Sequence, residues 1–376
     1  MKQIYLDYSA SAPLRPEVKT AMRKAEAVFG NPNSIHGSGR EALNLVDASR
    51  RDIASILDCQ PNEIIFAGSA TEADNLAIKG VALSQKKGHV ITTAIEHKAV
   101  LESYHWLEDQ GFAVSYLEPN HEGMILVEQI ESAIRPDTIL VSVMYANNEI
   151  GTIQPIREIG KLIEVLNRGR THPILFHTDA VQAGNYLNLD VKSLHVDLLT
   201  LSGHKLGGPK GVGLLFVRNG VNLTPQIHGG GQERGIRSGT INVVGVVGLT
   251  TAIELAQKNK IRETKRLSAL QRYLINALHQ MPGVAINGST TNRLPNNLNF
   301  SVPKITSEEL VIGLDRQGIA VSAASACAAG SIEPSYVLSA MGLSQSRINS
   351  SVRISWGWET TKSDLTTLVK SLKNLV

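Results

Sequence analysis

The sequence has 376 residues, 42% of them hydrophobic, and this length favours one large and one smaller domain over a single compact core. Its 37 basic and 34 acidic residues nearly balance, so bulk charge gives no reason to expect direct nucleic-acid or membrane binding. The two cysteines exclude a disulfide framework, and the N-terminal MKQIYLDYSA carries no apolar signal segment, so we expect a cytoplasmic protein.

Short apolar runs alternate with amphipathic stretches from about residue 40 to residue 260. The predicted strands are Ile64–Phe66, Val90–Thr93, Ile139–Met144, Ile174–Phe176, Asp197–Leu201 and Val212–Val217. The predicted helices between them include Ala73–Leu83, Lys98–Gln110 and Ile156–Asn167. This alternation indicates a largely parallel sheet that is covered by helices on both faces.

A different pattern follows, and it begins with the amphipathic helix predicted over Ile261–Met281. Beyond it the sequence predicts strands and helices in mixed order: Asn297–Val302, Glu308–Gln317, Ile319–Ser322, Val352–Ser355 and a last helix from Thr361. This mixture is typical of a small α+β domain, onto which the residues before about Leu14 are expected to fold back. We therefore predict a large cofactor-binding domain over residues 15–260 and a small domain over residues 1–14 plus 261–376.

Ligands of open parallel sheets bind beyond the carboxyl ends of the strands, so the residues after each apolar run are examined first. Lys205 follows a predicted strand in the segment Ser-Gly-His-Lys. A lone loop lysine is usually only solvated. Here the neighbouring Ser202 and His204 provide donors that suit a phosphate, and a lysine that forms an imine with an aldehyde cofactor needs a phosphate anchor nearby.

Asp179 lies at the end of another predicted strand, in the segment His-Thr-Asp-Ala-Val-Gln. An acid at this place can simply cap the next helix. Alternatively, it pairs with a protonated pyridine nitrogen and keeps the ring able to accept electrons. Lys205 and Asp179 on two strands of one sheet together favour a pyridoxal phosphate site.

The segment from Gly68 to Asn75 opens a predicted helix, and Thr71 with Asp74 resembles a capping box. Small residues at a helix N-terminus can also expose backbone N–H groups to an anion, so both readings stay open. His97 and Asn148 follow two further strands. A lone histidine at such a place is more often a hydrogen-bonded structural residue than a catalyst.

Several motifs occur in a consistent order along nearly the whole chain. They are Tyr5–Ala10, Gly30–Ser34, Asn147–Gly151, His177–Gln182, Ser202–Lys205, Ser325–Cys327 and Ser351–Arg353. As a set they resemble the cysteine desulfurases of the class V aminotransferase superfamily. The resemblance implies a mostly parallel seven-stranded sheet in a large domain like that of aspartate aminotransferase, with a smaller α+β domain.

The resemblance also implies which residues surround pyridoxal 5′-phosphate. Those residues are Ala70, Thr71, His97, Asn148, Asp179, Gln182, Ser202, His204, Lys205 and Thr240. Lys205 would form the imine, Asp179 would contact the pyridine nitrogen and Gln182 would approach the phenolic oxygen. His97 would stack on the ring as a catalytic residue that moves protons.

The phosphate of the cofactor is expected to lie between Thr71, Ser202 and His204. In the family a threonine from the second subunit completes this site, and the matching residue here is Thr240. The resemblance therefore implies a homodimer with shared active sites.

The carboxylate of the substrate is expected to bind Asn148 and Arg353. The planar fork of an arginine matches a carboxylate in two hydrogen bonds. From the sequence pattern alone, an arginine in an edge strand is usually a surface ion pair, so this role rests on the resemblance. The sequence contains no pattern that calls for a metal.

Cys327 lies in a run of small side chains, Ser322–Ser331, with no bulky residue to build a core. A cysteine is most often a small buried hydrophobe, as we interpret Cys59. In the resembling family such a cysteine attacks the substrate sulfur and becomes a persulfide. Either His97 or the cofactor could collect the thiol proton, and the sequence does not choose between them.

The predicted function is a cysteine desulfurase that converts L-cysteine to L-alanine and stores the sulfur on Cys327. An acceptor protein of iron–sulfur cluster assembly or of tRNA thiolation would then take the sulfur. The chain ends at Val376, without the further tail expected of members dedicated to an iron–sulfur scaffold, which leaves tRNA thiolation or another acceptor open. Alternatives are a selenocysteine lyase, another aminotransferase-type enzyme, or a non-catalytic sulfur-relay or scaffold protein that would be expected to lose Lys205 or Asp179.

Overall fold

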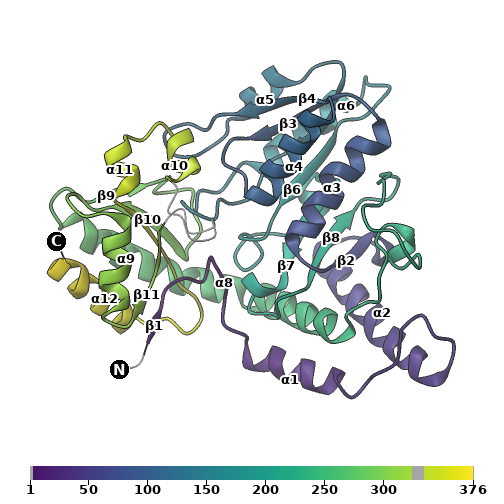
Figure 1. Cartoon of the computed structure of the whole chain (residues 1–376), viewed down its shortest axis with the longest axis horizontal. Coiled ribbons are helices and arrows are strands. Elements are labelled where there is room, and N and C mark those ends of the chain that lie inside the picture. The colour runs from purple at the N-terminus through teal and green to yellow at the C-terminus, as the bar shows by residue number, and fades with distance from the viewer. Residues whose placement is uncertain (1–2, 324–333, 376) are drawn as a thin grey trace.

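The computed structural model describes residues 3–323 and 334–375. Figure 1 shows a larger lobe, which holds the main sheet, beside a smaller lobe that contains both ends of the chain. The 37-residue helix α8 (Val243–His279) passes from one lobe to the other.

Seven strands form the main sheet. Their order is β2 (Ile64–Ala67), β8 (Gly213–Val217), β7 (Leu198–Ser202), β6 (Leu175–Asp179), β5 (Thr138–Ser142), β3 (His89–Thr93) and β4 (Ala113–Leu117). The pairs from β7 to β4 are parallel, whereas β8 runs antiparallel to both β2 and β7. The predicted α/β class and the largely parallel sheet are confirmed.

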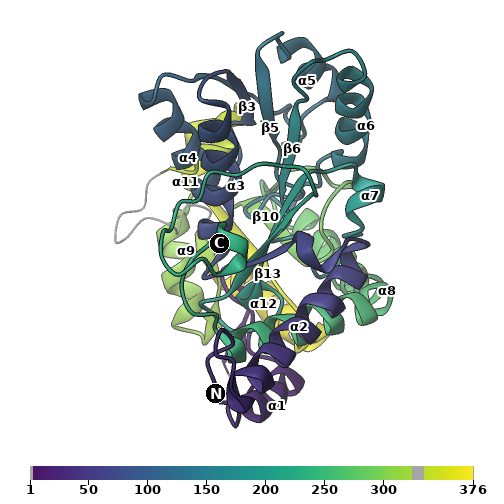
Figure 2. The same ribbon diagram turned by 90° about the vertical axis from the view of Figure 1, so that its right-hand side faces the viewer.

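Helices cover both faces of this sheet because its strands are apolar on both sides. Ile64 and Phe66 pack into one hydrophobic cluster and Ile65 into the other, as the period of two along a strand requires. The first face is covered by α2 (Gly37–Leu57), α5 (Val127–Ala133), α6 (Ile156–Asn167), α7 (Val191–Leu194) and the N-terminal half of α8. The second face is covered by α3 (Ala70–Gln85) and α4 (Lys98–Asp109). Helix α1 (Pro16–Ala25) packs on α8, at the edge of the larger lobe in Figure 2.

The smaller lobe is built around a second sheet, which has four strands. Its order is β12 (Ser322–Ala323), β13 (Ser351–Ser355), β10 (Asn297–Ser301) and β9 (Ala285–Asn287), with antiparallel pairs throughout. The helices of this lobe are α9 (Ser307–Asp315), α10 (Tyr336–Ala340), α11 (Gln345–Asn349) and α12 (Lys362–Leu375). Strand β1 (Ile4–Tyr5) pairs with β11 (Ile319–Ala320), so the N-terminal residues do fold back onto this lobe.

Some elements differ from the sequence-based expectation. Strand β4 and helices α1 and α2 were not predicted, and the predicted strand Ile319–Ser322 is divided between β11 and β12, which belong to different sheets. Helix α8 begins at Val243 rather than at Ile261. Its first turns are rich in valine, threonine and glycine, which favour helices weakly, and tertiary packing stabilises them instead.

The division into residues 15–260 and the remainder stays a prediction. Helix α8 runs through residue 260 without a break, but its two halves pack differently. Val246, Leu249 and Ile253 belong to the core under the main sheet, whereas the leucines from Leu267 to Leu278 belong to the core of the small lobe. Within the described part of the chain, no helix combines the length and apolar character needed to cross a bilayer.

The packing of α8 in the small lobe can be tested by measuring stability. Leu274 is fully buried in the small-lobe core, and Ile261, on the same helix, is 83% exposed. We expect Leu274→Ala to lower the free energy of unfolding by about 2–5 kcal/mol, because the lost methyl groups leave a cavity. The matched Ile261→Ala should change it by less than about 0.5 kcal/mol. Urea unfolding of both variants measures this, and equal costs would contradict the packing.

Candidate active site

A cavity of about 550 Å³ lies at the edge of the main sheet where β5, β6 and β7 end. Ten of the residues predicted from sequence line it, and they come from segments far apart in the chain. They are Ala70, Thr71, His97, Asn148, Asp179, Gln182, Ser202, His204, Lys205 and Arg353. Parallel strands bring their carboxyl ends to one edge, which explains why these residues meet.

The N-terminus of α3 forms one wall of this cavity. The Ser69 hydroxyl accepts the N–H of Glu72 at 3.1 Å and the Ser69 carbonyl accepts that of Ala73, while Ala70 and Thr71 line the cavity. A helix N-terminus with such amides favours an anion. The capping box predicted from Thr71 and Asp74 is wrong, because Ser69 is the N-cap and Asp74 lies one turn inside the helix.

Gly213 lets β8 begin directly beneath this helix end. A Cβ atom at Gly213 would lie 2.8 Å from the Ser69 carbonyl carbon and 3.0 Å from the Ala70 nitrogen. Those backbone atoms cannot retreat as a flexible side chain could. The close approach therefore requires glycine at this position. It also fixes the distance between the α3 N-terminus and the sheet.

Lys205 ends the short 3-10 helix η2 (Gly203–Lys205), which follows β7 directly. Its ammonium donates to the backbone carbonyls of Ser9 at 2.5 Å and Ala10 at 2.8 Å. Gln182 also donates to the Ser9 carbonyl, at 3.1 Å. The N-terminal segment Asp7–Ser11 thus reaches across the cavity and holds the lysine in place.

Asp179 is the last residue of β6, and it is buried. One of its carboxylate oxygens accepts the N–H of Val181 at 2.9 Å. Burial is the main cause that raises the pKa of Asp179 to about 7, and the neighbouring carboxyl of Asp74 is the second. The charge of Lys205 lowers this pKa, but by less. A cationic partner in the cavity would favour the ionised form, as expected of a carboxylate that faces a protonated ring nitrogen.

His97 caps the N-terminus of α4 and faces the cavity. Its Nδ1 accepts the N–H of Ala99 at 3.1 Å, which places the proton of the neutral ring on Nε2. Burial first, and then the positive charges of Lys205 and Lys98, lower the pKa of His97 to about 4. The ring is therefore neutral at physiological pH and presents one N–H donor.

His204 is a second neutral imidazole in the cavity. Burial and the charges of Lys205 and Lys210 lower its pKa to about 4. Its Nδ1 lies 3.4 Å from the Ser11 hydroxyl, so the N-terminal segment also orients this ring. Together with Ser202 it adds polar groups near the α3 N-terminus, and these suit a phosphate.

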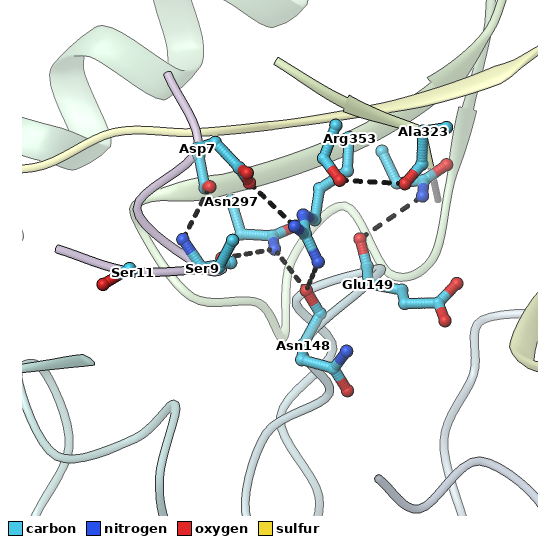
Figure 3. A network of polar contacts seen from close by, with 12 residues as sticks. Asp7, Ser9, Ser11, Asn148, Glu149, Asn297, Ala323 and Arg353 are labelled. Carbon is cyan, nitrogen blue, oxygen red and sulfur yellow. Dashed lines mark hydrogen bonds and ion pairs between the residues drawn. The ribbon is translucent and has the colours of Figure 1, made fainter. Parts of the chain in front are cut away.

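Arg353 lies on β13 and reaches the cavity from the small lobe, as Figure 3 shows. Its guanidinium donates to Asp7 at 2.7 Å and to the backbone carbonyl of Asn148 at 3.2 Å. Asn297 donates to the same carbonyl and to the Ser9 hydroxyl. The Arg353 Nε and the Asn148 side-chain oxygen are buried without a hydrogen-bond partner among the described residues. These two groups are therefore available to form hydrogen bonds with a ligand.

Two predicted site residues, Thr240 and Cys327, are not among those that line the cavity in the described part of the chain. Thr240 is exposed and does not line the cavity of its own chain. Cys327 lies outside the described residues. Cys59 is partly buried against the main core, where burial and neighbouring carboxylates raise the pKa of its thiol to about 12, so it is unreactive.

Sequence reasoning missed Asp7, Ser9 and Ser11 as parts of the site. Asp7 and Ser9 appeared only as members of the N-terminal motif Tyr5–Ala10, and Ser11 follows that motif, with no strand end to mark any of them. Asp74 was read as a capping residue, although it lines the cavity. A signal for Asp74 was its place three residues after Thr71, on the helix face that turns back toward the sheet.

The comparison with known proteins agrees with this geometry. The family model for aminotransferase class-V matches residues 4–368. The chain therefore belongs to the class-V aminotransferases, a pyridoxal-phosphate-dependent family. Within them it belongs to the cysteine desulfurases. It is 44% identical to the cysteine desulfurase IscS of Dictyoglomus turgidum and 45% identical to that of Clostridium botulinum, over its full length and 95% and 94% of those relatives.

Solved structures show the same relationship. A NifS-like protein superposes with a TM-score of 0.93 at 36% identity, with 99% of both chains covered. DndA from Streptomyces lividans superposes with a TM-score of 0.79 at 34% identity, over 93% of this chain and 98% of that one. SspA, solved in complex with cysteine, gives a TM-score of 0.81 at 39% identity, over 94% and 99% of the two chains.

The residues around the cavity fit the cofactor of the family. Lys205 supplies an amine for the aldehyde, and the α3 N-terminus with its neighbouring hydroxyl and imidazole groups suits the phosphate. Asp179 is a buried acid that lacks a close cation, and a protonated pyridine nitrogen would provide one. The chain is accordingly an enzyme that uses pyridoxal phosphate.

The protonation state of His97 can be measured directly. We expect its ring to stay neutral with the proton on Nε2 from about pH 5.5 to pH 8, because burial and two lysines hold its pKa near 4. Nitrogen-15 NMR of histidine-labelled protein reads both the charge and the tautomer. The urea-unfolded chain is the control, in which the same histidine should titrate near 6.5. A His97 signal that titrates in this range in the folded enzyme would contradict the structure.

Proposed function

We propose that the enzyme removes sulfur from L-cysteine, releases L-alanine and keeps the sulfur as a persulfide on Cys327. The relatives named cysteine desulfurase match the whole chain, and the SspA structure contains cysteine. The observation that carries the proposal is that one cavity collects the Lys205 amine, the buried Asp179 and the Arg353 guanidinium. These three groups suit an amino-acid substrate on pyridoxal phosphate.

Lys205 is the residue proposed to hold the cofactor and to move the substrate proton. When bound, pyridoxal phosphate supplies an aldehyde for amines and a ring that stabilises the negative charge left on the substrate Cα. The Lys205 Nζ takes the proton from Cα. The carbonyls of Ser9 and Ala10 then stabilise the ammonium that this proton creates. Asp179 keeps the ring nitrogen protonated, and Gln182 lies beside it at the cavity wall.

Ala70, Thr71, Ser202 and His204 are the residues proposed to hold the cofactor phosphate. They combine helix amides with hydroxyl and imidazole groups, and their side chains are uncharged at neutral pH. The dipole of α3 contributes further attraction for the phosphate. A rigid anchor of this kind keeps the reacting end of the cofactor at Lys205.

Arg353 and Asn148 are proposed to bind the substrate carboxylate. Arg353 is 5% exposed, and Asp7 and the Asn148 carbonyl fix its orientation before the substrate arrives. Its remaining donors, and the Asn148 amide, are then available at the cavity. A pre-oriented guanidinium loses less entropy on binding a carboxylate than a free one.

His97 is proposed to donate a hydrogen bond rather than to collect a proton. Its Nδ1 already accepts the Ala99 N–H, and its Nε2 carries the ring proton. A second proton on the ring would face the Ala99 N–H and two lysine charges. The neutral ring can therefore stack over the cofactor and donate a hydrogen bond from its Nε2–H to a developing anion.

Cys327 is proposed as the nucleophile on the basis of family membership. Its thiolate attacks the substrate sulfur, so that a sulfur–sulfur bond forms while the bond between sulfur and Cβ breaks. The electron pair of the broken bond remains on the carbon side and is protonated to give the methyl group of alanine. The thiol is only a few per cent ionised at neutral pH unless its surroundings lower its pKa.

The two cysteines give a matched test of this role. We expect Cys327→Ser to lower alanine release by about 1,000-fold or more, because a hydroxyl cannot accept the sulfur. The absorbance of the bound cofactor should remain. Cys59→Ser should keep nearly full activity, since Cys59 lies away from the cavity. Alanine quantification and trapping of the persulfide by alkylation measure both.

The same assay separates the alternatives. Retained turnover in Cys327→Ser would remove the nucleophile assignment. A keto acid in place of alanine would indicate an aminotransferase reaction, and turnover limited to selenocysteine would indicate a lyase. Lack of turnover by the unmodified enzyme would favour a sulfur-relay or scaffold role.

We further propose a cytoplasmic homodimer in which the partner subunit's Thr240 completes the phosphate site. Thr240 is exposed on its own chain, at the end of the segment that Arg237 ties to Glu72 at 2.6 Å on α3. The sulfur acceptor is proposed to be an iron–sulfur scaffold or a tRNA-thiolation enzyme. Co-purification with the tagged enzyme would identify it.

The shared site predicts an effect of Thr240→Val on the cofactor. We expect the pyridoxal phosphate dissociation constant to rise about 10-fold or more, because a hydrogen bond to a charged phosphate is lost. The dimer mass should not change, which light scattering checks. Unchanged affinity, or a monomeric wild-type enzyme, would contradict the shared site.

A further inference from the structure

Asp74 is a buried carboxyl at the cavity that no role assigned so far uses. It lies on α3, its side chain is 1% exposed, and it lines the cavity together with Asp179. Neither of its oxygens has a hydrogen bond of good geometry to the described residues. A carboxylate with at most the Thr200 hydroxyl as a donor, and no cation beside it among the described residues, is costly in such a place, whereas a protonated carboxyl is tolerated.

Among the described residues, the groups that face Asp74 do not include a cation that pairs with it. His177 on β6 is 3.5 Å away, but it is fully buried, and burial lowers its pKa to about 4. Its nitrogens lie near the Ser142 and Thr200 hydroxyls, at 3.1 and 3.2 Å, as in a neutral ring.

The other ionisable groups nearby are carboxyls. Asp179 and Glu96 are both buried, and each repels a charge on Asp74. Burial raises the pKa of Asp74 to about 7, and the nearby Thr200 hydroxyl offsets only part of that shift. Lys205, one of the cations that line the cavity, lowers the pKa of Asp179, which accepts the N–H of Val181.

We propose that Asp74 and Asp179 share one negative charge, with the proton held on Asp74 and the charge on Asp179. The asymmetry follows from their surroundings, because Asp179 accepts the Val181 N–H and is stabilised by the charge of Lys205, whereas the described residues give Asp74 neither a backbone donor nor a cation. Asp74 is thus a positioning residue: as a neutral acid beneath the cofactor, it leaves Asp179 as the anion that faces the ring nitrogen. This inference rests on the ring-nitrogen role proposed for Asp179.

The proton on Asp74 is visible by infrared spectroscopy. With carbon-13 in the aspartate carboxyls, the loaded enzyme at about pH 7 should show the carbonyl stretch of one protonated aspartic acid. Aspartate labelling separates this band from Glu96. The band should vanish in Asp74→Asn and persist in the matched Asp179→Asn. Its absence from the wild type, or its survival in Asp74→Asn, would overturn the proposal.

Cofactor affinity separates this inference from the role of Asp179 itself. Asparagine resembles a protonated aspartic acid, so Asp74→Asn should keep the pyridoxal phosphate dissociation constant within a factor of about three. Asp179→Asn should raise it by at least about 10-fold, because an ion pair is lost. A large loss in Asp74→Asn would overturn the inference alone. Unchanged affinity in Asp179→Asn would overturn the proposed role of Asp179, whatever the infrared band shows.

The pH dependence of stability gives a readout that needs no cofactor. The folded pKa of Asp74 lies above its unfolded value of about 4. The stability that the protonated Asp74 contributes is therefore fully present below about pH 4 and is lost as pH rises toward 7. Asparagine has no such loss. The urea midpoint of cofactor-free Asp74→Asn should exceed that of the wild type by a margin that grows from about pH 5 to pH 8. A constant margin, or a lower midpoint at high pH, would contradict a protonated Asp74.

Discussion

The burial of Asp179 at the end of β6 is the constraint on which the site depends. An acid this far from water needs donors and a cation, and the structure provides one backbone N–H and the distant charge of Lys205. The protonated ring nitrogen of the cofactor is the cation proposed to pair with this acid. The parallel sheet determines where that cation can sit, because the ends of β5, β6 and β7 leave only one edge for a ligand.

The N-terminal segment Asp7–Ser11 links this edge to the small lobe. Its backbone holds Lys205, which follows β7 of the main sheet, and its Asp7 carboxylate holds Arg353, which belongs to β13. Asn297 adds a bond to Ser9 and another to the turn at Asn148. The groups proposed for the amine end and the carboxylate end of an amino-acid substrate are therefore held by the same few residues, although they come from different lobes.

Much of the fold and the centre of the site could be read from the sequence, for a physical reason. Buried parallel strands appear as apolar runs, and function gathers where they end, so Lys205 and Asp179 stood out. Other features leave no such pattern. The first half of α8 is helical because it packs under the sheet, not because its valines favour a helix, and Asp7 reaches Arg353 only through the fold. The role of Cys327 came from the family resemblance and not from local pattern.

The balance of charge explains why a neutral Asp74 suits this cavity. Lys205, Lys210 and Arg353 are cations that line it, whereas Asp7 is paired with Arg353 and Asp179 is the acid proposed to face the ring nitrogen. The histidines are held neutral by burial and by the lysines, so they cannot offset further negative charge. A doubly charged phosphate must also enter. One more carboxylate beneath the cofactor would oppose both the phosphate and Asp179, and keeping the proton on Asp74 avoids that repulsion.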